Sequence, residues 1–270
     1  MKDAPEALTA GKRAMKRILG TALALGLALA GALPAAAQDK LKIGTEAAYA
    51  PFAFVLPSGE LSGFDIDVTK ALCASMGVEC EIVNQAFDGL IPALNAKKID
   101  AIIASMSITP ERLEAIDFAG PYYTVPALFI AAKDSGIELT PEGLDGKYVG
   151  VQRGSTMANY VEKTFPNARV QVYDTSDAAN LDLASGRVDL VFADSVVLQE
   201  FLKTPDGAGF AAVGEPVYDA EILGTGAGIG LRKGDTALKE KFDAALTAII
   251  DSGEYQKINE TYIPVSILPQ

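Results

Sequence analysis

Two positions in the sequence carry groups suited to binding a small anion. Arg112 lies in the segment ITPER, just after the end of a predicted strand, and its planar guanidinium suits bidentate binding of a carboxylate. Thr156 begins a predicted helix, where free backbone N–H groups and the helix dipole favour negative charge. The alternative for Arg112 is a surface ion pair with Glu111 or Glu114.

A carboxylate with a similar placement is that of Asp194, which ends the apolar run VDLVFA. Ligands of open α/β sheets usually lie at the carboxyl ends of the strands, so Asp194 is placed to accept hydrogen bonds from an ammonium group. The alternative is that Asp194 only caps the helix that follows.

The composition excludes several kinds of chemistry. The chain of 270 residues has no His, which excludes Ser-His-Asp and Cys-His catalysis and the common zinc sites, and we expect no metal and no cofactor. Cys73 and Cys80 are its two cysteines. We expect them to form a disulfide between a helix end and the next strand, worth about 2–3 kcal/mol, although a reactive or metal-binding pair is an alternative.

The N-terminal residues have the pattern of a secretory signal. Lys16 and Arg17 precede an apolar run over 18–33, and small residues follow at 35–37. We therefore expect residues 1–37 to be a cleaved signal peptide, with Met15 as a candidate true start, and the mature protein to be periplasmic. A membrane anchor is the alternative, but 16 apolar residues fall short of the roughly 20 that span a bilayer.

The mature chain is strongly acidic. Five Lys/Arg and two Asp/Glu precede Gln38, so the formal charge changes from −12 to −15 when residues 1–37 are removed. Such a charge repels nucleic acid and anionic membranes and attracts small cations, so we expect no nucleic-acid partner.

Strand and helix patterns alternate along the chain and then start again. The first series predicts strands at 41–46, 81–83 and 100–104 and helices at 65–76, 88–97 and 110–115; the second predicts strands at 148–152, 170–173 and 188–193, helices after 154–156 and at 176–185, and a last helix around 238–249. The segments AKKIDAIIAS (96–105) and ASGRVDLVFAD (184–194) share one pattern. Two similar α/β lobes with mainly parallel sheets are predicted, with one continuous doubly wound domain as the alternative.

Seven ordered motifs carry a resemblance to a known family: TEAAYAPF (45–52), GFDIDVTKAL (63–72), AFDGLIPALNAKKIDAIIASMSITPER (86–112), PYY (121–123), VGVQRGST (149–156), LDLASGRVDLVFAD (181–194) and GTGAGIGLRK (224–233). The chain resembles the periplasmic polar amino-acid-binding proteins of ABC importers (solute-binding protein family 3), especially the lysine/arginine/ornithine/histidine, arginine and opine binders. The resemblance implies a two-lobed periplasmic binding protein type II fold. Residues 38–123 and 227–270 would form lobe 1 and residues 127–222 lobe 2, with crossover hinge strands near 123–127 and 222–226 that let the lobes close on a ligand.

The resemblance also implies roles for site residues. Arg112 would bind the ligand carboxylate with backbone N–H groups near Ser107 and Thr156, and Asp194 would bind the α-ammonium with the Ser107 hydroxyl and the Ser105 carbonyl. Tyr49 and Phe87 would sandwich the side chain, and Glu46 would meet its distal cation. Asp65 would support that cation or cap its own helix. The implied ligand-binding residues are Glu46, Tyr49, Asp65, Phe87, Ser105, Met106, Ser107, Arg112, Gln152, Ser155, Thr156, Met157 and Asp194.

Departures from the family pattern bear on the choice of ligand. Ala104 stands where the broad binders have a serine, Met157 replaces a polar residue and Gln152 an aliphatic one. Glu46 matches the arginine branch, and the acid at Asp194 favours an ordinary amino acid, because an amide stands there in the opine binders. We expect arginine first, then lysine, ornithine and histidine.

The resemblance implies a monomeric binding protein without enzymatic activity that delivers its ligand to inner-membrane permease subunits. Three alternatives remain: a binder of another polar amino acid or of an opine, an exported cyclohexadienyl-type dehydratase, and a module that presents its closed form to a receptor.

Overall fold

The computed structural model describes residues 40–269. The predicted signal peptide, residues 1–37, lies outside the described residues. None of the helices in the described part of the chain has the length and apolar content needed to span a bilayer.

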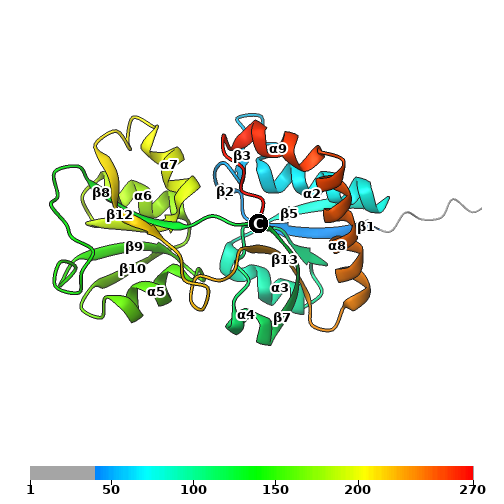
Figure 1. Ribbon diagram of the computed structural model, residues 1–270, viewed down its shortest axis with the longest axis horizontal. Coiled ribbons are helices and arrows are strands. Elements are labelled where there is room, and N and C mark those ends of the chain that lie inside the picture. Colours follow the sequence, from blue (N-terminus) through cyan, green and yellow to red (C-terminus); the bar gives the residue numbers. More distant parts are fainter. Residues whose placement is uncertain (1–39, 270) are drawn as a thin grey trace, which may run out of the picture. The chain divides into compact units, whose positions relative to one another are not determined.

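The first five-stranded sheet combines strands from both ends of the described chain (Figure 1). Its order is β5 (Glu79–Asn84), β1 (Lys40–Thr45), β6 (Ala101–Ile102), β13 (Ala227–Arg232) and β7 (Ile116–Tyr123). Strands β5, β1 and β6 are parallel, and β13 is antiparallel to both of its neighbours. The elements that accompany this sheet are α2 (Phe64–Met76), η1 (Phe87–Gly89), α3 (Leu90–Asn95), α4 (Pro110–Ala115), α8 (Thr236–Asp251), α9 (Glu254–Tyr262) and a small sheet of β2 (Ala48–Tyr49), β3 (Ala53–Val55) and β4 (Leu61–Ser62).

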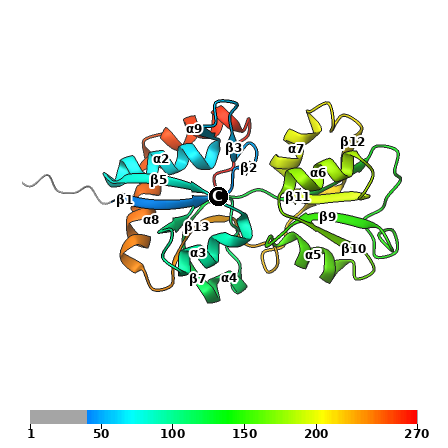
Figure 2. The ribbon, with the colours of Figure 1, turned by 180° about the vertical axis from the view of Figure 1, so that it is seen from behind.

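The second sheet repeats this design, as Figure 2 shows from behind. Its order is β10 (Arg169–Tyr173), β9 (Tyr148–Gln152), β11 (Leu190–Asp194), β8 (Ala127–Ala132) and β12 (Phe210–Val217), with helices α5 (Met157–Thr164), α6 (Ser176–Ala184) and α7 (Ser195–Leu202). Here β8 is the strand antiparallel to both neighbours. In each sheet, therefore, the fourth strand is the one whose chain arrives from the other sheet: β8 follows β7, and β13 follows β12.

Two chain segments, 124–126 and 218–226, connect the sheets, and they begin and end beside each other. Tyr123 pairs with Ala227 at the first sheet, and Ala127 pairs with Val217 at the second. Neither segment is a strand. The second is a turn in which the Asp219 carboxylate accepts hydrogen bonds from the N–H groups of Glu221 and Ile222.

Both sheets are covered on both faces by apolar side chains, and the inner strands β8, β11 and β13 are accordingly nearly continuous buried runs. In the first sheet, Ile43 and Ile229 pack with α2, α8 and α9 on one face, and Ile102 packs with Leu90 of α3 on the other. In the second sheet the Phe129 and Phe192 rings stack with their centroids 3.9 Å apart. Burial of these side chains is the main stabilising contribution to each lobe.

The expected disulfide is present. Cys73 near the end of α2 is bonded to Cys80 of β5, with 6.1 Å between the Cα atoms. Between them the helix ends at Gly77, whose φ of 68° lies in the left-handed region that favours glycine. The disulfide therefore fastens the helix end to the edge strand of the first sheet.

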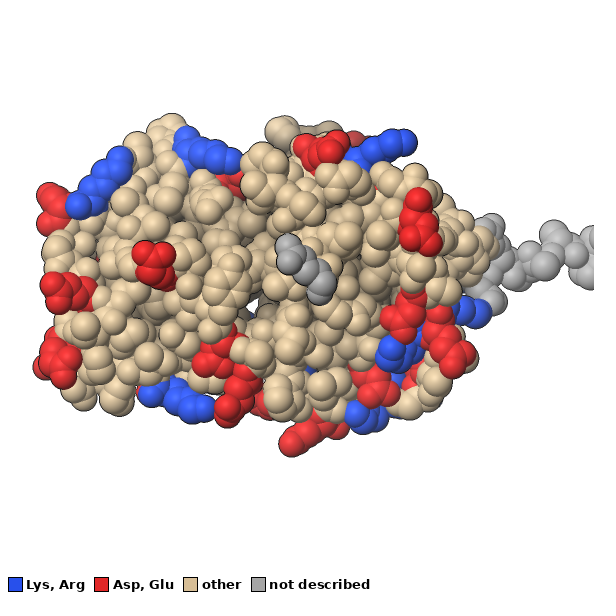
Figure 3. All heavy atoms as spheres, viewed as in Figure 1, with Lys and Arg blue, Asp and Glu red and all other residues tan. Residues whose placement is uncertain are grey.

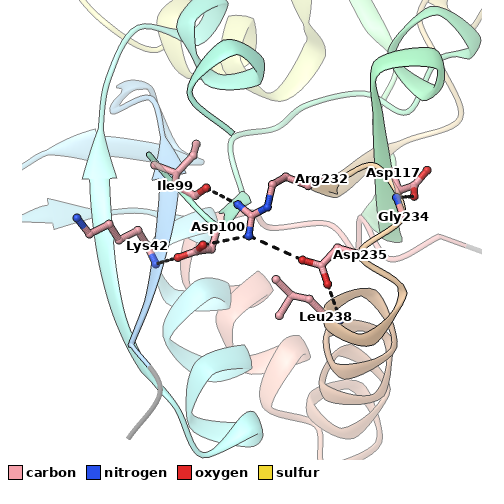
Figure 4. Close-up of polar contacts among 8 residues, drawn as sticks. All are labelled: Lys42, Ile99, Asp100, Asp117, Arg232, Gly234, Asp235 and Leu238. Carbon is pink, nitrogen blue, oxygen red and sulfur yellow. Dashed lines mark hydrogen bonds and ion pairs between the residues drawn. The ribbon is translucent and has the colours of Figure 1, made fainter. Parts of the chain in front are cut away.

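An arginine-centred network holds the start of α8 against the same sheet (Figure 4). Arg232 donates to the Ile99 carbonyl at 2.8 Å and to the Asp100 carboxylate at 3.2 Å, and it forms an ion pair with Asp235 at 3.8 Å. Asp235 also caps α8 by accepting from the Leu238 N–H, and Asp100 accepts from the Lys42 N–H. Figure 4 also shows Asp117 accepting from the Gly234 N–H, at 2.7 Å.

Candidate functional site

One cavity is lined by Gln152 and Asp194 at the ends of β9 and β11 of the second sheet, and by loops, η1, α4 and the small sheet beside the first sheet. It contains all of the residues predicted to bind ligand except Asp65 and Met106. The lining residues are Glu46, Tyr49, Phe87, Ala104, Ser105, Ser107, Arg112, Gln152, Ser155, Thr156, Met157 and Asp194.

Arg112 is buried, with 9% of its surface exposed, and its guanidinium touches both halves of the described chain. It donates to the Ser107 carbonyl at 2.9 Å and to the Gly154 carbonyl at 3.0 Å. Its carbon Cζ lies 5.5 Å from the centroid of the Phe87 ring. Burial lowers the pKa of Arg112 to about 10, and the negative charges of Glu111 and Asp194 oppose this shift. Arg112 forms no ion pair with Glu111 or Glu114 among residues 40–269. The Arg112 guanidinium is therefore a buried positive charge without a carboxylate in contact with it.

Local sequence holds Arg112 in place. Thr109 is the N-cap of α4, its hydroxyl accepting from the Arg112 N–H at 3.2 Å, and Pro110 occupies the first helical position. Across the cavity, Thr156 precedes α5 and Gly154 takes a φ of 72°. A Cβ at Gly154 would lie 3.0 Å from the Asp88 Cβ, so glycine permits this close approach of the two halves.

Asp194 is the last residue of β11 and is partly buried. Burial raises its pKa to about 6, while the hydroxyl groups of Tyr49 and Tyr123 and the charge of Arg112 oppose the rise. Asp194 stands at the N-cap position of α7, but within the described structure its side chain accepts no capping hydrogen bond. The carboxylate therefore faces the cavity as an acceptor for a positively charged group.

Glu46 is the most unusual carboxylate of the cavity. It is 6% exposed; its Oε2 accepts from the Gln152 side-chain amide at 2.9 Å, and its Oε1 is a buried oxygen with no hydrogen-bond partner in the described structure. Burial raises the pKa of Glu46 to about 7; the Gln152 hydrogen bond opposes the rise, and the negative charges of Asp177 and Asp88 add to it. A buried acceptor without a donor is costly, so this oxygen indicates where a cationic donor would bind.

Aromatic walls complete the cavity. Phe87 is 8% exposed and Tyr49 is partly buried, with its ring stacked on Phe52 at a centroid distance of 6.0 Å. Ser155 donates from its hydroxyl to the Gln152 carbonyl at 2.7 Å, which folds the turn before α5. The cavity can therefore offer donors to an anion, acceptors to two cationic groups and flat apolar surface between them.

Asp65 and Met106 lie behind the cavity wall. Asp65 is 1% exposed and accepts hydrogen bonds from Ser105 and Tyr122, while its helix has no side-chain cap. Met106 is 1% exposed and packs in the apolar cluster beside α3. Ala104, noted in the sequence as standing where the broad binders have a serine, does line the cavity. Tyr122, part of the motif PYY, was not predicted to bond Asp65, because no local pattern shows that contact.

A second cavity adjoins the first at the two connecting segments. It shares Ser105, Ser107, Met157 and Asp194 with the first cavity. Tyr123 lines this second cavity. Its hydroxyl is buried and has no hydrogen-bond partner in residues 40–269. Of the charged residues that line these cavities, Glu46 and Arg112 are buried and Asp194 is partly buried. On the face that Figure 3 shows, Lys, Arg, Asp and Glu side chains lie mainly toward the margins.

Known proteins are similar to this chain in sequence and in fold. The chain matches the bacterial extracellular solute-binding proteins, family 3, over residues 41–265. It is 46% identical over 252 residues to the L-arginine-binding protein of Pseudomonas aeruginosa, covering 89% of this chain and 97% of the relative. It is 42% identical over 255 residues to the lysine/arginine/ornithine-binding periplasmic protein of Escherichia coli, covering 93% and 98%.

Among solved structures, an ancestral arginine-binding protein bound to arginine is similar, with a TM-score of 0.77, 39% identity, and coverage of 83% of this chain and 98% of that one. The paired five-stranded sheets are those of the two-domain periplasmic binding protein fold. On its sequence and its architecture, this chain belongs to the bacterial extracellular solute-binding proteins, family 3.

Proposed function

We propose that the protein captures a basic L-amino acid in the periplasm and delivers it to the permease of an inner-membrane ABC transporter. Arginine is the first choice of ligand, followed by lysine, ornithine and histidine. The names of the similar proteins support a basic amino acid as the ligand class, since they include arginine-, lysine/arginine/ornithine- and histidine-binding proteins.

The observation that carries this proposal is the unpaired Oε1 of Glu46. A ligand with a guanidinium or ammonium group at the end of its side chain supplies the missing donor and a compensating charge. A neutral or acidic side chain leaves a buried carboxylate unpaired, which costs several kcal/mol of binding free energy. The site therefore selects by the penalty it imposes on the wrong side chain.

The remaining groups of an amino acid have candidate partners in the same cavity. Arg112, with the N–H groups before α5, would bind the α-carboxylate by exchanging its present carbonyl acceptors for a charged one. Asp194, the Ser107 hydroxyl and the Ser105 carbonyl would bind the α-ammonium. Tyr49 and Phe87 would enclose the aliphatic part of the side chain.

We propose further that the ligand is enclosed by a hinge motion. Residues 38–123 and 227–270 would move as lobe 1 against residues 127–222, with bending near 123–127 and 222–226. Two hydrogen bonds that join the halves support this: Gln152 to Glu46 and Arg112 to Gly154. Both would break on opening and free the groups that meet the ligand.

The proposal is tested with a ligand panel on protein that has been unfolded and refolded to remove any bound metabolite. Thermal unfolding is followed with the twenty L-amino acids, ornithine, citrulline and octopine. A ligand at a thousand times its Kd adds about 4 kcal/mol to the free energy of unfolding. Arginine should raise Tm strongly and citrulline, its neutral near-isostere, much less. A response confined to neutral or acidic amino acids would refute the basic-ligand assignment.

Octopine tests the opine alternative in the same panel. Its extra carboxylate would lie near Asp194, where like charges repel, so we expect no shift in Tm. A dehydratase is the other alternative, since one similar structure, 32% identical with a TM-score of 0.74, is an ancestral amino-acid-binding protein described as a precursor of cyclohexadienyl dehydratase. We propose binding without turnover, and loss of prephenate or arogenate in the presence of the protein would contradict it.

A further inference from the structure

Behind the cavity wall lies a closed ring of hydrogen bonds around Asp65. Its Oδ2 accepts from the Ser105 hydroxyl at 3.0 Å, and its Oδ1 accepts from the Tyr122 hydroxyl at 2.9 Å. The Tyr122 hydroxyl in turn accepts from the Ser105 N–H at 3.1 Å. Asp65 and Tyr122 are essentially unexposed, so the ring is shielded from water.

Ser105 needs such support because its backbone is in an unfavourable conformation. Its φ is 54°, in the left-handed region that non-glycine residues rarely occupy unless their surroundings impose it. The ring takes up both the N–H and the hydroxyl of Ser105. The polar atom of Ser105 that remains for the cavity is its carbonyl oxygen.

The segment that starts at Ser105 is fastened on its other side as well. Met106 accepts from the Gly228 N–H at 2.9 Å, and Ile108 donates to the Gly226 carbonyl at 2.8 Å. The Ser107 carbonyl accepts from Arg112. These contacts hold residues 106–108 and Arg112 without the help of Ser105, so the conformation of Ser105 decides the direction of its own carbonyl, the acceptor for the ammonium.

We propose that Asp65 is a positioning residue for the α-ammonium of the ligand. It does not touch the ligand but holds Ser105 in the left-handed conformation that turns its carbonyl oxygen into the cavity. This inference rests on the proposed function and deepens it: Glu46 reads the side chain, whereas Asp65 acts on the part that all α-amino acids share. This role differs from the one expected from the sequence, in which Asp65 would be a counter-ion of the cation at the end of the ligand side chain.

Two substitutions at the same position separate positioning from charge. Asp65→Asn keeps an acceptor for Tyr122 and places an amide donor opposite the Ser105 hydroxyl, which can accept, so the ring survives without the charge. Asp65→Ala removes both the hydrogen-bonded ring and the charge. We expect Asp65→Ala to weaken arginine and citrulline by the same factor, about tenfold or more, and Asp65→Asn to stay within about threefold of wild type.

Titration calorimetry on the refolded protein measures these affinities. A loss in Asp65→Asn that falls on arginine and spares citrulline would overturn the proposal, because it would make Asp65 a counter-ion of the side chain. Unchanged affinities in Asp65→Ala would overturn it too. A wild-type protein that binds no basic amino acid would instead refute the proposed function, so the two failures are distinguishable.

A second variant keeps the test independent of the folding of Asp65→Ala. Tyr122→Phe removes the hydroxyl that links Asp65 to the Ser105 N–H, and it should likewise weaken arginine and citrulline equally, by about tenfold. The 2-deamino analogue of arginine has no group that donates to the Ser105 carbonyl, so its affinity should be the same in wild type and Tyr122→Phe. Unequal losses for arginine and citrulline, or a loss for the deamino analogue as large as that for arginine, would overturn the positioning role.

Discussion

Arg112 and Arg232 belong to the same lobe and meet very different surroundings. Arg232 contacts two carboxylates, those of Asp100 and Asp235, and its side chain is 23% exposed. Arg112 is more deeply buried and donates to two backbone carbonyls. Its pKa is lowered to about 10, which records the cost of burying a charge without a counter-ion.

The same contrast holds for two acids. Asp100 has both carboxylate oxygens occupied, by the Lys42 N–H and by Arg232, whereas one oxygen of Glu46 has no donor in the described chain. Proteins satisfy the charges that serve their stability. Unsatisfied charges gathered in one cavity indicate a ligand that supplies the missing partners, and substitutions can separate these two roles.

The largest effect should come from Arg112→Ala. Arg112 is the one cationic side chain among the described residues that line the cavity, and in the proposed binding mode it pairs with the ligand carboxylate. We therefore expect affinity for arginine and citrulline alike to fall about a thousandfold, or roughly 4 kcal/mol, by calorimetry. The stability of the ligand-free protein should change little. Near-unchanged affinity would overturn the assignment of the carboxylate site.

Glu46→Gln should produce a selective loss. We expect arginine to weaken about a hundredfold, or roughly 3 kcal/mol, and citrulline by no more than a few-fold, measured in the same calorimetric titration. Asp100→Asn is the matched control, an acid of the same lobe outside the cavity, and should leave both affinities unchanged. Equal losses for arginine and citrulline would remove Glu46 from the side-chain pocket.

The pH dependence of stability follows from the raised pKa of Glu46. The folded, ligand-free protein holds this proton more tightly than the unfolded chain, so the stabilisation is complete below the ordinary pKa of 4.5 and is lost as pH rises through about 7. The raised pKa values of Asp65 and Asp194 act in the same direction. Between pH 5 and pH 8 we expect Glu46 alone to lower the free energy of unfolding by about 2 kcal/mol, and the other two carboxylates to add to this fall, by urea titration.

Protonation of these carboxylates lowers the affinity for a cationic ligand. Because a cationic ligand needs ionised carboxylates, affinity for arginine should rise from pH 5 to about pH 7.5. Glu46→Gln should make both profiles less steep, and a pH dependence of stability that is identical in this variant and in wild type would show that Glu46 does not contribute to it.

Arg232→Ala should have the smallest effect of these substitutions. Unlike Arg112→Ala, it should lower stability and leave ligand affinity nearly unchanged. Losing its partly exposed network should lower the free energy of unfolding by about 1 kcal/mol in urea titration. Arginine affinity should stay within twofold of wild type. A large loss of affinity without a loss of stability would break the division between the two arginines.

Much of the fold could be predicted from patterns along the chain. The helix at Pro110–Ala115 and the strand at Tyr148–Gln152 have the predicted bounds, since a Thr-Pro start and a β-rich apolar run are strong local signals. Strand β12 gave no such signal because Gly214 and Pro216 interrupt it. Nor does any local pattern reveal that β8 and β13 insert antiparallel into the sheets, because their pairing depends on partners distant in sequence.

The cavity was predictable where motifs fix both residue type and side-chain direction, as for Arg112 and Asp194. Asp65 shows the limit. Its place in the first turn of α2 allows its carboxylate to face either the cavity or the Ser105 hydroxyl, and only the packed structure selects the second. The hydrogen bond from Gln152 to Glu46 joins residues 106 positions apart, which no local pattern encodes.

The pairing of Tyr123 with Ala227 has a consequence for the architecture of the gene product. The chain leaves the first sheet at the end of β7 and returns to it about a hundred residues later at the start of β13, beside the point where it left. In this sense the whole second domain is inserted where a β-hairpin would have its loop. A short turn between these two residues would therefore complete the first sheet without any rearrangement of its strands. Recombination could therefore replace the domain between Tyr123 and Ala227 with another while the first sheet kept its strand order.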